Sequence, residues 1–287
     1  MRAGFALLML FAAGPAAAAQ QTRPSPAAAM SGAFALDGPA VQGGMLRGRA
    51  PAGAISVGFG DQAVALAPGG RFIIAFDRDH APTATLSARF ADGGTIARTL
   101  AVAPRSWRIE HVNISQRPPA VPDEAYRLRR EAETARIREA RARRSPVDGW
   151  AQRFIWPSTG RISGQFGSQR VFRGVPAAYH SGVDVAAGAG APVVAPADGI
   201  VVLAGPPMFS LEGNLVILDH GMGLNSAFLH LARADVAVGQ RVRQGQRIGS
   251  VGATGRATGP HLHWSLMWNG ARLDPQLAAG PMAAAAR

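Results

Sequence analysis

The stretch GRATGPHLHWSLMW, residues 255–268, predicts a β-strand that follows a glycine-rich turn. Its two histidines, His261 and His263, are separated by one residue, so on a strand they share one face with Cα atoms about 6.6 Å apart. That spacing lets one imidazole bind an ion while the other reaches the substrate or water beside it. A histidine pair alone does not distinguish packing from metal binding, so partners must come from the rest of the chain.

The composition limits which partners are available. The chain has 287 residues, of which 47% are hydrophobic and 17% charged, enough for two modest domains with their own cores. It contains no cysteine, which excludes disulfides, thiol catalysis, cysteine-ligated metals and a lipoprotein anchor. Any metal must therefore be bound by His, Asp or Glu.

The formal net charge is +12, and every basic side chain other than histidine is arginine. This charge favours polyanionic partners such as nucleic acid, an anionic membrane or cell wall, or it reflects only a soluble basic surface. No basic stretch is interleaved with stacking aromatics, and no helix-turn-helix or zinc-knuckle pattern is present. We therefore expect no nucleic-acid partner.

The N-terminus has the pattern of a signal peptide. Arg2 precedes the apolar run FALLMLFAAG (5–14), and small residues follow it, with cleavage expected after Ala19. The apolar run is shorter than the roughly 20 residues that span a bilayer, and no later stretch is long enough. The mature protein is predicted to be exported, periplasmic or extracellular, and not membrane-spanning.

Short apolar alternations, such as Phe72, Ile74 and Phe76, recur between the turn sequences APGG and ADGG. They predict a small antiparallel β-sandwich or barrel, and from Phe154 onward the strand pattern returns. The chain is thus predicted to be mainly β. The expected divisions are a signal peptide (1–19), a low-complexity linker (20–30), an N-terminal β domain (31–117), a proline-rich segment with a charged linker helix (118–149), a C-terminal β domain (150–279) and a tail (280–287).

Residues 123–144, DEAYRLRREAETARIREARARR, predict the charged helix. Acidic residues in its first turn and arginines in its last turn complement the helix dipole. Its apolar positions are few and mostly alanine, which indicates a weakly amphipathic helix that lies across a neighbour or bridges domains. A solvated spacer is one interpretation, and an arm that binds a regulatory partner is the other.

Candidate metal ligands lie in two further motifs. YHSGVDVA (179–186) contains His180 and Asp184, and FLHLA (228–232) contains His230. Residues four apart on a straight strand are about 13 Å apart, so shared ligation by His180 and Asp184 requires a bend, which Gly182 allows. Two histidines and a carboxylate with one open position are what a catalytic zinc needs. Together with the HLH pair, these residues predict a metal site.

Three motifs occur in a characteristic order: HSGVD, AFLHL and GATGRATGPHLHW (252–264). With APADGIVVLAG and GQRVRQGQRIGSVG between them, they make residues 155–275 resemble the lysostaphin/LytM-type zinc peptidases of bacterial cell walls. The combination is specific, whereas single motifs would not be. The resemblance implies a C-terminal antiparallel β-sheet peptidase domain with a groove above the sheet. Its implied partners are peptide stems or cross-bridges of peptidoglycan.

By this resemblance, zinc is bound by His180, Asp184 and His263. His230 and His261 correspond to residues that orient the attacking water and stabilise the transition state. The implied function is an exported zinc metalloendopeptidase that hydrolyses peptide cross-links of peptidoglycan, with a zinc-activated water attacking the scissile amide. His220 falls where relatives often carry a histidine, but we predict that it is structural.

Two other functions compete with this one. Some relatives have lost ligands and activate other wall hydrolases, but here all three ligands and both auxiliary histidines are present. A swinging-arm carrier domain needs an acceptor lysine, and the chain has none. The chain departs from the family around Arg170 and Arg173, where it carries an insertion before the first ligand motif, in the loops beside the groove. The first 120 residues match no family known to us.

Overall fold

The structure is a computed structural model that describes residues 33–114 and 123–283. It is mainly β with antiparallel sheets, which confirms the predicted fold class. The predicted signal peptide and the linker at 20–30 lie outside the described residues. Among the residues that the structure does describe, no helix combines the length and the apolar character needed to cross a membrane.

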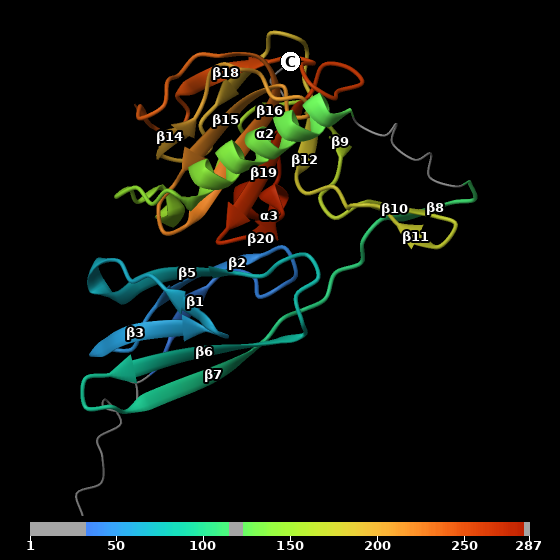
Figure 1. Cartoon of the computed structure of the whole chain (residues 1–287). Coiled ribbons are helices and arrows are strands. Elements are labelled where there is room, and N and C mark those ends of the chain that lie inside the picture. Colours follow the sequence, from blue (N-terminus) through green and yellow to red (C-terminus); the bar gives the residue numbers. More distant parts are fainter. Residues whose placement is uncertain (1–32, 115–122, 284–287) are drawn as a thin grey trace, which may run out of the picture. The chain divides into compact units, whose positions relative to one another are not determined.

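Two small sheets form the N-terminal region (Figure 1). Buried side chains alternate along Thr83–Phe90, as at Leu86 and Ala88, whereas the strand residues from Phe72 to Ala75 are buried on both faces. The Ile55 side chain is exposed. One sheet has the order β1–β2–β5, formed by β1 (Ala35–Asp37), β2 (Met45–Arg49) and β5 (Arg71–Ala75). The other has the order β4–β3–β6–β7, formed by β3 (Ala54–Phe59), β4 (Gln62–Val64), β6 (Thr83–Phe90) and β7 (Thr95–Ala101), and the 3-10 turn η1 (Pro68–Gly70) precedes β5.

The C-terminal region is built on a ten-stranded sheet whose central path is β17–β14–β15–β16–β19–β12–β9. Trp264, Trp268 and Phe228 are fully buried against it and fix the centre of its core. Its strands are β9 (Arg161–Gly164), β12 (Val183–Ala186), β13 (Pro192–Val194), β14 (Gly199–Leu203), β15 (Asn214–Asp219), β16 (Leu224–Ala234), β17 (Arg241–Val242), β18 (Arg247–Val251), β19 (Leu262–Trp268) and β20 (Ala271–Leu273). The 3-10 turn η2 (Gly149–Ala151) precedes this sheet and the short helix α3 (Pro275–Ala279) follows it.

The register of three central strands brings distant motifs together. β12 and β19 are antiparallel neighbours, and Asp184 is paired directly with His263. On the other side of β19, His263 is paired with Leu229 of β16, the residue before His230. Because the side chains of a strand alternate between its faces, this register gathers the motif residues on one face of the sheet.

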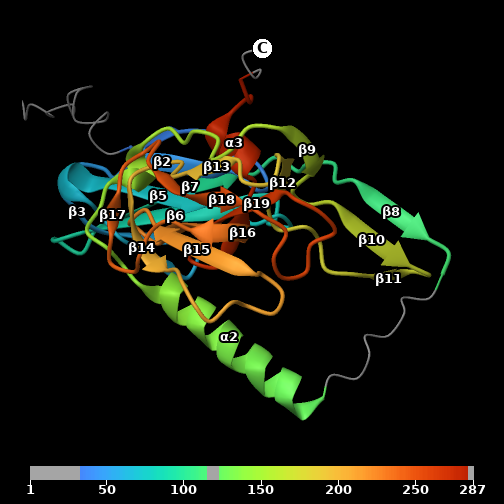
Figure 2. The same cartoon turned by 90° about the horizontal axis from the view of Figure 1, so that it is seen from above.

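A third sheet, with the order β11–β10–β8, joins β8 (Ile109–Val112) to β10 (Gln169–Phe172) and β11 (Val175–Pro176). Its β8–β10 pair is parallel, and β8 comes from the segment assigned to the N-terminal domain by sequence. Figure 2 shows these strands beyond the β9–β12 edge of the large sheet. The segment around Arg170 that departs from the family pattern is therefore β-structure, and Arg170 pairs with Glu110 of β8 at 2.9 Å.

The charged segment contains the helix α2 (Glu124–Ala142). Asp123 caps its N-terminus by accepting a hydrogen bond from the Tyr126 amide at 2.6 Å. The helix lies along the large sheet (Figures 1 and 2), where Ile137 and Ala140 pack against side chains of β14, β15 and β16. It therefore has a packed inner face and is not solvated on every side.

Candidate metal centre and active site

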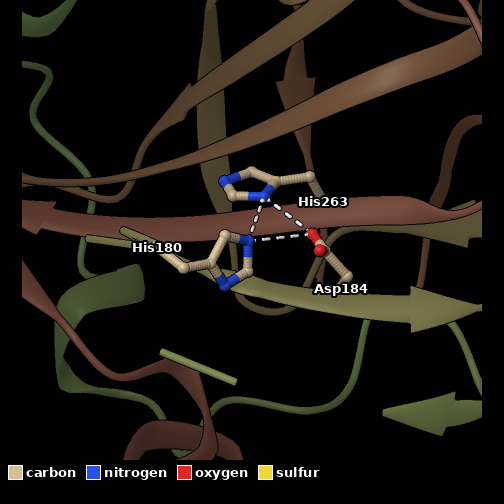
Figure 3. A group of neighbouring side chains, drawn as sticks. All are labelled: His180, Asp184 and His263. Carbon is tan, nitrogen blue, oxygen red and sulfur yellow. Dashed lines mark hydrogen bonds and ion pairs between the residues drawn. The ribbon is translucent and has the colours of Figure 1, made fainter. Parts of the chain in front are cut away.

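Three candidate metal ligands meet at β12 and β19 (Figure 3). Nε2 of His180 lies 3.1 Å from Oδ1 of Asp184 and 3.1 Å from Nδ1 of His263. The Nδ1 atom of His263 lies 2.9 Å from the same oxygen of Asp184. One ligand atom from each residue thus points to a common centre, and within the described ranges this is the one such group of three or more His, Asp or Glu side chains.

The backbone around the cluster is shaped by two glycines. β12 begins only at Val183, so the bend that brings His180 back to Asp184 lies in the preceding segment with Gly182. A Cβ atom on Gly182 would lie 2.5 Å from the Trp264 carbonyl oxygen and 2.7 Å from Nε2 of His263. A Cβ atom on Gly164 of β9 would lie 2.3 Å from Oδ2 of Asp184. Any larger residue would force the cluster apart.

The neighbouring groups set the protonation of the cluster. Burial opposes a charge on His180, but the hydrogen bond and charge of Asp184 outweigh burial and raise the pKa of His180 above its usual value. Burial would raise the pKa of Asp184, yet the hydrogen bonds of His180 and His263 hold that pKa far below its ordinary range. Burial lowers the pKa of His263. The cluster therefore combines an anionic oxygen with two imidazoles.

A cation suits this donor set. The Nδ1 atom of His180 lies 3.0 Å from the Gln165 carbonyl oxygen, which can only accept, so Nδ1 carries the hydrogen and neutral Nε2 has a lone pair. That lone pair faces the Asp184 carboxylate, so the two need a proton or a cation between them. Zinc takes imidazole and carboxylate ligands at about 2.0–2.2 Å, a distance that three atoms about 3 Å apart can all share around one ion.

His230 and His261 lie beside the cluster, with their ring centroids 4.8 Å apart. Nδ1 of His230 donates to the Thr254 carbonyl at 2.9 Å, and Nδ1 of His261 donates to the Gly259 carbonyl at 2.8 Å. A neutral imidazole whose Nδ1 donates in this way has a lone pair on Nε2. Nε2 of His261 is 3.9 Å from Oδ1 of Asp184, farther than Nδ1 of His263.

The backbone of His230 is in the left-handed region, with φ of 62°, which is unusual for a residue with a side chain. The strand β16 bulges here: Asn214 pairs with Leu231 and Val216 with Phe228, so Leu229 and His230 together face the single residue between that pair on β15. The His230 amide donates to the Glu212 carbonyl at 2.9 Å, outside the regular ladder. With this backbone, the imidazole centroid of His230 lies 4.8 Å from that of His261 and 6.3 Å from that of His263.

The remaining described histidines take no part in the cluster. His220 is fully buried, and both of its ring nitrogens are engaged, by the Asp198 carbonyl at 2.8 Å and by the Ser226 hydroxyl at 2.7 Å. Burial lowers the pKa of His220 to about 4. His80 stacks on Phe59, and His111 lies on β8.

Two cavities flank the cluster. One of about 670 Å³ is lined by His180 and Asp184 together with residues of β8, β9 and β10. The other, of about 240 Å³, is lined by His263 and residues of α2, β16, β19 and β20. Sequence reasoning did not identify Gln165, Thr254 or Gly164, because two act through backbone carbonyls and the third through the absence of a side chain.

Comparison with known proteins agrees with the geometry of the site. Residues 178–275 match Peptidase family M23. Over 133 residues, 46% of this chain, the sequence is 40% identical to the peptidoglycan DD-endopeptidase ShyA of Vibrio cholerae. Over 102 residues, 36% of this chain, it is 42% identical to the DD-carboxypeptidase/endopeptidase Mpg of Neisseria meningitidis. The aligned regions span only 30% and 23% of those two proteins.

A solved structure covers more of the molecule. The crystal structure of a protein from Pseudomonas aeruginosa that is assigned to peptidase M23 superposes with a TM-score of 0.62 at 31% sequence identity. The match covers 84% of this chain and 96% of that one. The likeness therefore includes residues beyond the 178–275 range.

Proposed function

The chain belongs to peptidase family M23, and on this premise we propose that it is an exported zinc metalloendopeptidase that hydrolyses peptide cross-links of bacterial peptidoglycan. The observation that carries the proposal is the convergence of His180 Nε2, Asp184 Oδ1 and His263 Nδ1 on one centre, with His230 and His261 beside it. The similarity to ShyA and Mpg supports peptidoglycan as the substrate.

In this proposal, His180, Asp184 and His263 hold the zinc ion. When bound, the ion polarises the scissile carbonyl and lowers the pKa of a coordinated water toward about 7. The carbonyl of Gln165 keeps His180 in the tautomer that presents Nε2. Gly164 and Gly182 keep the space that the ligand side chains occupy.

His230 and His261 supply proton transfer and hydrogen bonds. Each is fixed by a backbone carbonyl at Nδ1, so each offers Nε2 to the substrate side. Burial, followed by the neighbouring charge of His261, lowers the pKa of His230 and keeps that ring neutral at neutral pH. A neutral Nε2 can accept a proton from the attacking water and return it to the leaving amine. A protonated Nε2 can donate a hydrogen bond to the developing oxyanion.

Purified mature protein incubated with peptidoglycan sacculi tests this function. We expect release of muropeptides that mass spectrometry identifies as products of peptide-bond cleavage. The release should stop with a chelator and return when zinc is added back. A folded, zinc-loaded protein that releases nothing would overturn the proposal, as would release that a chelator does not affect. For export, N-terminal sequencing of the secreted protein should give a chain that begins near Gln20.

A further inference from the structure

The 240 Å³ cavity on the His263 side of the cluster is bounded by α2 on one side and by the large sheet on the other. Its lining includes three arginines, Arg130 and Arg141 of α2 and Arg272 of β20, and one carboxylate, that of Glu212. The cavity therefore has more positive than negative groups at a place that adjoins a candidate metal ligand.

The one carboxylate is already paired. Glu212 accepts two hydrogen bonds from Arg130, at 2.8 and 3.1 Å, in the bidentate arrangement that satisfies both groups. Glu133, on the same helix, also pairs with Arg130 and accepts from the Ser210 amide and hydroxyl at 2.8 Å. The side-chain hydrogen bond with Glu212 raises the pKa of Arg130. This network docks α2 on the sheet, and it commits the hydrogen bonds of the Glu212 carboxylate to Arg130, although the charge of Glu212 still acts on Arg141 at longer range.

Arg141 and Arg272 have no ion-pair partner among the residues of 33–114 and 123–283. Nη1 of Arg141 contacts only the Sδ atom of Met267, at 3.2 Å, and its Nε is sealed from solvent without any acceptor. A thioether is a weak acceptor, so the guanidinium of Arg141 has no strong acceptor among the described residues, and its buried Nε has none at all. Burial, then the charge of Arg272, lowers the pKa of Arg141 to about 10. Such a pair of cations is stabilised by an anion.

The basic character continues beyond this cavity. Arg141 also lines an adjoining cavity of about 730 Å³, together with Arg138 and Arg144. The lining of that cavity contains no Asp or Glu. The cavity on the opposite side of the cluster is mixed in charge, because Arg108, Arg170 and Arg256 share its lining with Glu110 and Asp184. On the His263 side the one carboxylate of the lining is bound to Arg130, so a chain that extends there meets Arg141 and Arg272 without an unpaired acidic group.

We propose that Arg141 and Arg272 form a carboxylate-binding subsite, so that the enzyme prefers acidic peptides with a free carboxylate on the side of the scissile amide that lies next to His263. This inference rests on the proposed peptidase function and deepens it by assigning a substrate class. A planar carboxylate fits the fork of a guanidinium in two parallel hydrogen bonds, and arginine is the side chain best suited to that pairing.

Two synthetic cross-linked peptides, identical except that the carboxylates are free in one and amidated in the other, test the subsite. The wild-type protein should show a higher kcat/KM on the free acid, mainly through a lower KM. Arg141→Gln and Arg272→Gln should each reduce that preference about 10-fold or more, the loss expected for a charge-assisted hydrogen bond. Arg129→Gln removes one exposed charge from the same helix outside the cavity and should keep the preference.

Binding of the free-acid peptide to chelator-treated protein, followed by calorimetry, gives a readout that does not need turnover. The Arg141→Gln and Arg272→Gln substitutions should each weaken this binding. As the check on folding, the Tm of both variants and their zinc content before chelation should equal those of the wild type. If the wild type cleaves both peptides equally, or if both folded variants keep the preference, the subsite is wrong while the peptidase function stands. If the zinc-loaded wild type cleaves neither peptide nor sacculi, the function itself is wrong. Inorganic phosphate that binds as tightly as the peptide would indicate a general anion site and overturn the selectivity.

Discussion

His220 and the cluster around Asp184 place histidines in two similar settings beside one sheet, but the two settings differ in what the second ring nitrogen meets. In both settings a backbone carbonyl engages Nδ1 of a buried or half-buried ring. At His220 the second ring nitrogen, Nε2, hydrogen-bonds to the Ser226 hydroxyl, so both ring nitrogens have partners inside the protein. At His180 the second nitrogen faces Asp184 and His263, and at His230 and His261 the second nitrogen makes no hydrogen bond within the described residues. The two settings therefore differ in the partner of the second ring nitrogen and not only in burial.

The largest effect is expected from removing the anionic member of the cluster. Asp184→Ala leaves two imidazoles with no carboxylate between them, so zinc should be lost at stoichiometric chelator. Sacculus digestion should then fall by more than about 10⁴-fold, beyond the loss of a single proton-transfer group. Metal analysis and muropeptide release measure both. Retention of zinc and activity would show that the ion is bound elsewhere.

Removing the histidines that do not ligate zinc should give a smaller and different loss. His230→Ala and His261→Ala should each keep about one zinc and lower turnover by ~10²–10⁴, because they act on proton transfer and the transition state. The change should lie in kcat rather than in KM. A loss of zinc from His230→Ala would show that His230 is a metal ligand and would contradict its separation from His180, Asp184 and His263.

The space around the cluster can be tested by adding one methyl group. Gly164→Ala places a Cβ 2.3 Å from Oδ2 of Asp184, so the carboxylate must shift. We expect zinc affinity to fall about 10–100-fold, the range seen when an outer partner of a metal site is lost. Gly188→Ala is the matched control, since a Cβ there would meet nothing within 4 Å. If a competition titration gives equal zinc affinities for Gly164→Ala and Gly188→Ala, Gly164 is not needed to keep space for the Asp184 carboxylate.

The smallest effect concerns stability and not activity. His220 has a folded-state pKa of about 4, so between pH 6.5 and 4 the unfolded chain binds the proton that the folded one excludes. The free energy of unfolding should therefore fall as the pH falls through this window, by up to about 3 kcal/mol from this group. His220→Asn should have a weaker pH dependence in denaturant titrations while keeping zinc. If the free energy of unfolding of the wild type and of His220→Asn depends on pH in the same way, His220 is not the source of that dependence.

The site residues could be located from sequence because they lie in short motifs. The HLH spacing put His261 and His263 on one face of a strand, and the four-residue spacing of His180 and Asp184 required a bend near Gly182. Their meeting depends on the pairing of Asp184 with His263 across β12 and β19, which no local pattern encodes. The roles of these five residues stay predictions until metal and activity are measured.

Three features around the site could not be predicted from the sequence, because each depends on contacts between residues that are far apart in the chain. The left-handed backbone of His230 arises from a bulge between β15 and β16, and its sequence carries no glycine to mark it. The docking of α2 on the sheet depends on the pairing of Arg130 with Glu212, which are 82 residues apart in the chain, and on the packing of Ile137 and Ala140. Because the helix sequence has few apolar residues, the sequence alone allowed the interpretation of a solvated spacer. The pairing of β8 with β10 is likewise long-range.

Zinc content of His261→Ala and His263→Ala after equilibration with stoichiometric chelator tests the central claim most directly. Nδ1 of His263 lies 2.9 Å from Oδ1 of Asp184, whereas Nε2 of His261 is 3.9 Å away. We expect about one zinc per chain in His261→Ala and none in His263→Ala, with His220→Asn fully loaded as the control. A zinc-free His261→Ala beside a zinc-loaded His263→Ala would contradict it.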